Sequence, residues 1–355
     1  MNQETITPSR RFMRTIAHAT IRHAPALAMP LARRFAQAAF RRETPLHDET
    51  LAGLAAAFPE KDDRELQHIL RAYAHQRYTY HCEQTQLDFM TPSQLAAYCH
   101  ERVTIRGEDN LADALRRPEP ILGFTPHYGN FAITTLHIAQ RVSRERSVSM
   151  FFNPPEKNAY APRMKRLIEN LDVNAQPLYN DRSGLLKAFR ALHKGGFVGI
   201  MPDVYDYEAG TIFVPFFGRL AFAMTGTAFL ALKYDATVLP MYCHRVARGR
   251  FELVIDPPIT LHRSGQMEED IYWTTASVFR NVEAHLRERP EQWMYWDTFL
   301  RRVYPRVELP NGGPSWRSGV DALSQRFSSA SPVGAFVREL AARVRTMPLM
   351  EGTAE

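Results

Sequence analysis

Two hydrophobic patterns alternate along the central part of the chain. Short, almost continuous apolar runs are typical of buried strands, whereas apolar residues at helical spacing predict amphipathic helices. The expected strands cover residues 121–124, 148–152, 197–201, 237–243 and 251–255. The expected helices cover residues 48–58, 63–82, 91–99, 157–171, 184–193, 224–233 and 268–289, and a further helix starts at residue 131. This alternation predicts right-handed parallel crossovers and hence an α/β fold: a central, mostly parallel sheet flanked by helices, with an N-terminal helical region.

The stretch ILGFTPHYGNFAITTLH, residues 121–137, is the centre of this pattern. Its apolar strand is followed by a turn that contains His127 and Gly129, and the turn leads into the helix that starts at Phe131. His127 therefore follows the carboxyl end of a strand and precedes a helix N-terminus, which is where open α/β sheets bind ligands. A short turn with glycine also allows backbone N–H groups to face an anion or a developing oxyanion.

Composition narrows the class of protein. The 355 residues suffice for one large α/β domain or two ordinary ones, and the net charge of +6 favours nucleic acid, a membrane surface or an acidic carrier as partner. Three scattered cysteines predict neither a disulfide framework nor a zinc site and fit a reducing, cytosolic setting. No apolar stretch of about 18 residues, export signal, P-loop, dinucleotide fingerprint, hydrolase elbow or zinc-protease motif is present.

The first 45 residues form a basic segment with apolar residues between its arginines. Between residues 8 and 42 there is no acidic residue, and Pro25 and Pro30 are expected to break any single helix. Such a segment can lie on an anionic membrane surface with its apolar side buried and its arginines among the headgroups. Ordinary helices with a solvated basic face have the same pattern. A nucleic-acid-binding arm is disfavoured because no recognition motif follows.

The turn sequence resembles the core motif of a known family. Residues 127–132 read His-Tyr-Gly-Asn-Phe-Ala, and they resemble the motif of the lysophospholipid acyltransferase superfamily, specifically of the bacterial lipid A biosynthesis acyltransferases that transfer lauroyl or myristoyl chains. That family carries a histidine, four intervening residues and an acid, typically as His-Phe-Gly-Asn-Trp-Glu. Here the histidine, the Gly-Asn pair and the aromatic residue match, but Ala132 stands where the family has its acid.

Further blocks extend the resemblance from about Phe58 to about Arg302. Their order and spacing along the chain are more specific than any one of them. The blocks are Arg182, Gly195-Gly196, Pro202-Asp203, the Val-Pro-Phe-Phe-Gly sequence at 214–218, Thr225-Gly226 and the Pro-Glu-Gln-Trp sequence at 290–293. Proline, glycine and serine accumulate from residue 305 to residue 318, so the compact domain is expected to end near Arg306. We therefore expect three parts: the basic, membrane-associating segment 1–45, an acyltransferase-like α/β domain at 46–306, and a loose C-terminal tail at 307–355 with a possible helix.

The resemblance implies roles for individual residues. His127 would be the general base that activates the acceptor, Gly129 and Asn130 would hold the oxyanion, and Arg182 would contact a phosphate of the donor or acceptor. Phe216, Phe217 and Gly218 would line the acceptor side.

Ala132 leaves three interpretations of the missing acid. Asp203 can supply the carboxylate, because the ends of neighbouring parallel strands meet at one edge of a sheet; Asp206 and Glu208 are further candidates. Alternatively, the acceptor is an amine or another easy nucleophile that needs only an unassisted histidine. In the third interpretation His127 is a relic in a protein that binds lipid or acyl carrier without catalysis.

The function that the resemblance implies is acyl transfer at the cytoplasmic face of a bacterial inner membrane. A fatty acyl group would move from acyl carrier protein or coenzyme A, as the thioester substrate, to a lipid-like acceptor with a hydroxyl or amine group. Neither a metal nor a bound organic cofactor is expected, and nucleic acid is not an expected partner. The competing function is that of a non-catalytic homologue that binds lipid or acyl carrier.

Overall fold

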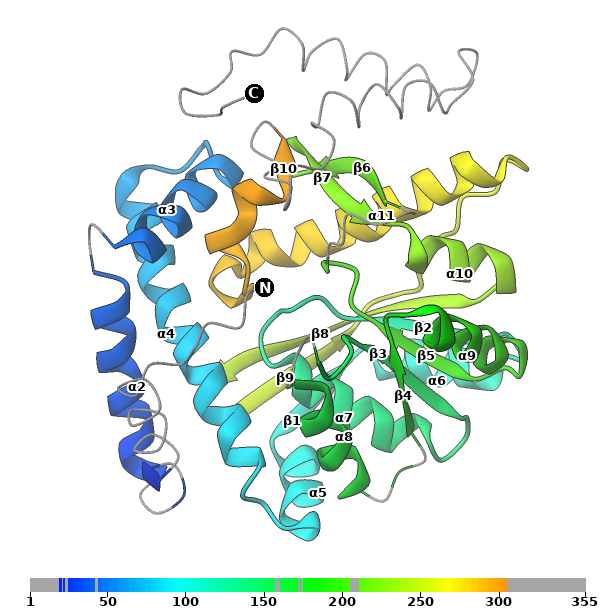
Figure 1. The fold of residues 1–355 in the computed structure, drawn as a ribbon, viewed down its shortest axis with the longest axis horizontal. Helices are drawn as coiled ribbons and strands as arrows, with labels where there is room; N and C mark the ends of the chain where they lie inside the picture. The colour runs from blue at the N-terminus through cyan, green and yellow to red at the C-terminus, as the bar shows by residue number, and fades with distance from the viewer. Residues whose placement is uncertain are drawn as a thin grey trace, which may run out of the picture.

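The computed structural model describes residues 19–20, 22, 25–41, 44–156, 160–171, 173, 175–204 and 211–304. Figure 1 shows a central sheet with helices on both of its faces and a group of N-terminal helices beside it. Three expectations fall outside the described residues: the arginines before residue 19, the candidate acids Asp206 and Glu208, and the tail at 307–355.

The central sheet has seven strands in the order β1-β9-β8-β2-β5-β3-β4. All neighbouring pairs are parallel except β8 and β9, which are antiparallel. The predicted α/β class with a mostly parallel central sheet is therefore confirmed. The strands are β1 (Val103–Arg106), β2 (Ile121–Phe124), β3 (Val148–Phe152), β4 (Ala175–Tyr179), β5 (Phe197–Ile200), β8 (Thr237–Ala247) and β9 (Arg250–Ile255).

The apolar run of β2 is continuous because helices cover both faces of the sheet. All four residues of this strand are buried, and alternate side chains enter opposite halves of the core: Ile121 packs in one hydrophobic cluster and Leu122 in the other. One face is covered by α5 (Pro92–Glu101), α6 (Glu108–Arg116), α7 (Phe131–Val142) and α8 (Tyr160–Glu169), and the other by α9 (Arg182–His193), α10 (Gly226–Tyr234) and α11 (Met267–Glu288).

Three N-terminal helices stand at one end of the molecule (Figure 1): α2 (Pro25–Ala39), α3 (Pro45–Ala57) and α4 (Asp63–Leu87). Pro25 and Pro30 were expected to break any single helix in this segment, and for Pro30 this expectation was wrong. Pro25 is the first residue of α2, where its missing N–H has no helical partner to lose, and Pro30 lies inside the helix. Packing of α2 along α4 holds the helix together despite Pro30. No helix within the described ranges combines the length and hydropathy needed to span a membrane.

A small second sheet in the order β10-β7-β6 was not predicted. The strands β6 (Thr211–Phe216) and β7 (Arg219–Met224) form a hairpin, and β10 (Val303–Tyr304) pairs with β7. The two turn residues, Phe217 and Gly218, have φ angles of 51° and 67°, as a type I′ turn requires. Two 3-10 helices, η1 (Pro290–Gln292) and η2 (Trp296–Arg301), connect α11 to β10.

Gly184, near the start of α9, provides a test of how closely this helix packs against the end of β4. A Cβ at Gly184 would lie 1.9 Å from the backbone oxygen of Tyr179, so Gly184→Ala should destabilise the protein by about 1–3 kcal/mol. Gly226, near the start of α10, is the matched control. It has no atom within 4 Å of an added Cβ, and Gly226→Ala should be neutral or stabilise by up to about 1 kcal/mol. Urea denaturation of both variants checks the difference, and equal stability losses would contradict it.

Candidate functional site

His127 lies on the loop that connects β2 to α7. Its backbone N–H donates to Oδ2 of Asp203 at 2.8 Å, and its backbone oxygen accepts a hydrogen bond from the N–H of Met294 at 3.0 Å. The loop is thus tied on one side to the residues after β5 and on the other to the segment between η1 and η2. These contacts fix the backbone that carries the imidazole.

The carboxylate of Asp203 lies directly against the imidazole. Nδ1 of His127 is 2.9 Å from Oδ1 of Asp203, and the indole N–H of Trp293 donates to Oδ2 at 3.0 Å. Asp203 follows β5, which pairs with β2, so the carboxyl ends of two adjacent parallel strands bring the acid and the histidine together. The Asp203 side chain is only 4% exposed and that of His127 is 18% exposed.

Asp203 remains ionised despite its burial. Desolvation by itself would raise the pKa of this carboxyl, but the charge of His127 and the hydrogen bonds from His127 and Trp293, together with the charge of Arg302, lower its pKa below the usual value. An ionised carboxylate can only accept a hydrogen bond, so Nδ1 of His127 carries the proton and donates it. In the neutral form of the ring the free lone pair then lies on Nε2. Within the described part of the chain, Nε2 of His127 has no hydrogen-bond partner.

Aromatic rings hold the imidazole on two sides. Its ring centroid lies 5.0 Å from that of Phe131 and 4.8 Å from that of Tyr295. The guanidinium of Arg302 lies 3.7 Å from the centroid of Tyr295 and donates to the backbone oxygen of Asp203 at 2.6 Å. Arg302 therefore connects the ring beside the histidine with the backbone of its acid.

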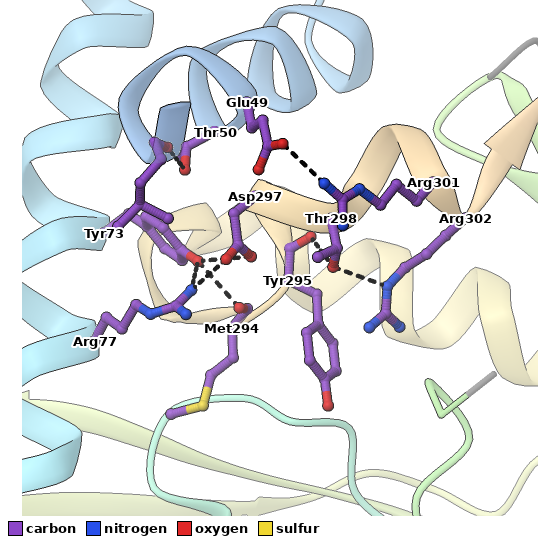
Figure 2. Close-up of polar contacts among 11 residues, drawn as sticks. Glu49, Thr50, Tyr73, Arg77, Met294, Tyr295, Asp297, Thr298, Arg301 and Arg302 are labelled. Atoms are coloured by element: carbon purple, nitrogen blue, oxygen red, sulfur yellow. Dashed lines mark hydrogen bonds and ion pairs between the residues drawn. The ribbon is translucent and has the colours of Figure 1, made fainter. Parts of the chain in front are cut away.

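A polar cluster between α4 and η2 holds the residues on either side of Tyr295 (Figure 2). The Tyr73 hydroxyl donates to the backbone oxygen of Met294 at 3.0 Å, and Arg77 forms a 2.8 Å ion pair with Asp297. In Figure 2 the Tyr295 ring extends away from this cluster. The N-terminal helices thus help to position a ring that contacts His127.

Gly129 and Asn130 lie in the loop after His127, but their N–H groups do not face the site. The Gly129 N–H donates to the backbone oxygen of Gln292 at 2.8 Å, and the Asn130 N–H donates to that of Cys243 at 3.1 Å. The oxyanion role expected for these two residues therefore finds no free N–H in this structure. Gly129 has a φ of 55°, and an added Cβ would lie 1.8 Å from the Cys243 oxygen, so glycine is needed here for close packing.

The Asn130 side chain belongs to a buried polar network that the sequence did not reveal. Its amide donates to Glu83 at 2.9 Å and its oxygen accepts from Gln84 at 3.0 Å, while Arg245 donates from Nε to Glu83 at 2.8 Å. Glu83 and Arg245 are 5% and 7% exposed. Because loss of one partner of a buried ion pair typically costs about 3–5 kcal/mol, this network anchors the loop firmly to α4 and β8. No sequence motif connects residues so far apart along the chain.

An apolar pocket lies beside the loop, between the sheet and α7. Gly123 of β2 and Gly199 of β5 are paired in the sheet and line its wall; the Phe197 ring packs against Gly123. The remaining lining residues are Phe124, Thr125, Thr134, Thr135, Ile138, Met150, Phe151, Phe152, Phe197, Ile200, Met201 and Met241.

The other predicted binding residues are not gathered around His127. Phe216 and Phe217 are each 3% exposed and pack in an aromatic core with Trp293 and Trp296, because the hairpin turns its rings inward. Their expected place on the acceptor side stays a prediction.

Gly218 is exposed at the tip of the β6–β7 hairpin, and Arg182 is exposed at the start of α9. Neither residue contacts His127 among the interactions of the described residues. Ala132, the second residue of α7, is fully buried, and its methyl group packs in the hydrophobic core.

No three His, Cys, Asp or Glu side chains come together as a metal site in the described part of the chain. Comparison with protein families found one match over most of the sequence: the family described as bacterial lipid A biosynthesis acyltransferase matches residues 8–302. A search of curated proteins found no match.

The depressed pKa of Asp203 predicts a specific acid sensitivity. A carboxyl whose pKa is lower in the folded state adds stability above its unfolded value, near pH 4, and this stability is lost as the pH falls through the folded-state pKa. The unfolding free energy of the wild type should therefore fall more steeply below about pH 5 than that of Asp203→Asn. Urea denaturation from pH 6 to pH 3, with the exposed-site variant Asp109→Asn as control, measures both slopes. Parallel slopes for wild type and Asp203→Asn would rule out this linkage.

Proposed function

This chain belongs to the bacterial lipid A biosynthesis acyltransferase family, and we propose that it transfers a fatty acyl group from a thioester to a lipid-like acceptor with His127 as general base. Membership of the family implies an acyltransferase. The observation that carries the proposed mechanism is the 2.9 Å contact between Nδ1 of His127 and the buried carboxylate of Asp203. In this proposal Asp203 takes the role of the acid that the family has at the position of Ala132.

The proposed reaction uses the two sides of the imidazole for different purposes. Nε2 of His127 removes the proton of the acceptor hydroxyl or amine while the acceptor atom attacks the thioester carbonyl. The resulting tetrahedral intermediate expels the thiolate, and the imidazolium returns its proton to the sulfur. Asp203 holds the ring in the required tautomer and stabilises the imidazolium, as the carboxylate does in catalytic triads.

In this proposal the acyl chain of the donor enters at the apolar pocket beside the loop. Its lining is almost entirely hydrocarbon and aromatic, and Thr125, two residues before His127, forms part of it. A chain lying there would place its thioester end toward the loop. The donor in this proposal is a thioester of acyl carrier protein or coenzyme A.

A supported histidine favours a hydroxyl acceptor, because a general base held by a carboxylate can activate a poor nucleophile. We place this reaction at the cytoplasmic face of the inner membrane. The support is the arginine-rich N-terminal segment together with Leu27 and Phe35, which are 58% and 38% exposed on α2. The contact of Asp203 with His127 supports this choice over an easier nucleophile, because it gives the imidazole an orienting acid.

Lipid profiles test the proposed reaction. Strains expressing wild type, His127→Ala, Asp203→Asn or no protein are compared by mass spectrometry of whole-cell lipids and small metabolites. A species heavier by one acyl group should appear with the wild type and be absent with His127→Ala and without the protein. With Asp203→Asn it should form more slowly, by up to about 10⁴-fold, because the ring loses its orienting acid. The mass gained and the fragment that carries it identify the acyl chain and the acceptor.

The same experiment distinguishes the competing function. If wild type and His127→Ala give identical profiles that differ from the empty strain, His127 is not the base. A protein that binds lipid or acyl carrier without catalysis predicts no acylated product in any strain, together with acyl-chain binding that His127→Ala leaves intact.

The glycines of the pocket wall give a second prediction. A leucine in place of Gly199 would project into the space that the pocket leaves beside Met150, whose Cγ would lie 3.2 Å from the new Cβ. Gly199→Leu should lower kcat/KM for the longest accepted acyl chain by about tenfold or more relative to a shorter chain. Competition between thioesters of different length measures this ratio, with Gly199→Ala as the smaller control substitution. An unchanged chain-length profile would show that the acyl chain lies elsewhere.

A further inference from the structure

The outer face of α9 exposes apolar and basic side chains together. Residues spaced three or four apart share one side of a helix, and here they form the α9 face: Arg182, Leu185, Leu186, Phe189 and Arg190. Leu185 is 39% exposed, Leu186 is 46% exposed and Phe189 is half-buried, while both arginines are exposed. The opposite side of the helix, with Ala188 and Leu192, packs into the core.

The α9 face is positively charged. No acidic residue occurs within α9, and the carboxylate of Asp181 before it caps the helix by accepting from the N–H of Gly184 at 2.7 Å. Lys187 is also exposed, and the ammonium of Lys233 on α10 lies 4.4 Å from the Phe189 ring centroid. Adjacent exposed leucines flanked by cations are more typical of a binding surface than of a solvated helix.

The α9 face begins at the edge of the sheet where His127 and the pocket lie. Asn180, just before α9, donates its N–H to the backbone oxygen of Phe152, and Phe152 lines the pocket. Between β2 and β4 lie three strand spacings, or about 14 Å. A partner on the α9 face could therefore reach the loop of His127 through a flexible arm, but not by direct contact.

These features favour an acidic protein as the partner. The phosphates of coenzyme A need cations but not exposed leucines, and a nucleotide is too small to use a helix face of this length. A membrane would use apolar and basic residues, but the basic N-terminal helix α2 lies at the opposite end of the longest axis of the molecule (Figure 1). An acyl carrier protein is acidic, and it presents its acyl chain on a flexible phosphopantetheine arm.

We propose that the α9 face is the docking surface for the acyl carrier protein that delivers the acyl chain to His127. This inference rests on the proposed acyl transfer and selects the carrier protein over coenzyme A as the donor. The arginines of the α9 face would pair with acidic side chains of the carrier. Leu185 and Leu186 would contact its apolar side chains. Association should therefore be faster at low ionic strength, as for other electrostatically steered complexes.

Two donors that carry the same acyl chain test the docking surface. One is the acyl carrier protein thioester, and the other is the N-acetylcysteamine thioester, which has no protein part and no phosphate. The variants Leu186→Ser and Arg190→Glu should each lower kcat/KM for the carrier-bound donor by about tenfold or more, with most of the effect in KM. Activity with the small thioester should stay within about twofold, because neither residue contacts the loop of His127. Arg280→Glu on α11 makes the same charge change at another exposed site and should affect neither donor.

Direct binding separates this inference from the proposed reaction. The unacylated carrier is titrated against wild type and the two α9 variants, a measurement that needs no turnover. Weaker carrier binding by the variants supports the docking surface, whether or not acyl transfer is found. Absence of acyl transfer with every donor would overturn the proposed reaction. Equal carrier binding and equal carrier kinetics in all variants would overturn the docking surface. Loss of binding to vesicles containing anionic lipid, with carrier binding unchanged, would assign the α9 face to the membrane.

Discussion

The buried carboxylate of Asp203 is the interaction on which the geometry of the site depends. It accepts hydrogen bonds from the backbone and the ring of His127 and from the indole of Trp293. One acid therefore fixes the loop, the orientation of the imidazole and the segment after α11 at the same time. Burial of this charge is tolerated because three donors and the nearby Arg302 guanidinium compensate the lost hydration.

The rest of the structure makes this arrangement rigid. The loop after β2 is joined to η1 through the Gly129 N–H and to β8 through the Asn130 N–H, and the Asn130 side chain enters the network of Glu83 and Arg245. These contacts use the polar groups that the sequence motif suggested for an oxyanion. In this structure the N–H groups of Gly129 and Asn130 therefore hold the backbone of the loop. Rigid support of this kind lowers the reorganisation that a general base requires.

Much of the fold was predictable because the central strands are buried on both faces. Continuous apolar runs identified β2, β3, β5, β8 and β9 close to their observed bounds. The strands at the two edges, β1 and β4, were missed because an edge strand buries less surface and tolerates polar residues and proline, as Gln176 and Pro177 of β4 illustrate. The β6–β7 hairpin was also missed, since its turn is Phe217-Gly218 rather than the Asn-Gly or Asp-Gly pair that usually signals such a turn.

The sequence by itself determined that this is an α/β protein, which family it belongs to, and that His127 lies at the carboxyl end of a buried strand. It also favoured Asp203 as the replacement for the missing acid, but it could not show that Asp203 reaches His127, because local periodicity does not reveal the order of the strands in the sheet. Only the tertiary structure placed β5 beside β2, and with it Asp203 against Nδ1 of His127. It also decided that Phe216 and Phe217 face the core and that the leucines of α9 face solvent, since the direction of a side chain depends on what packs against its element.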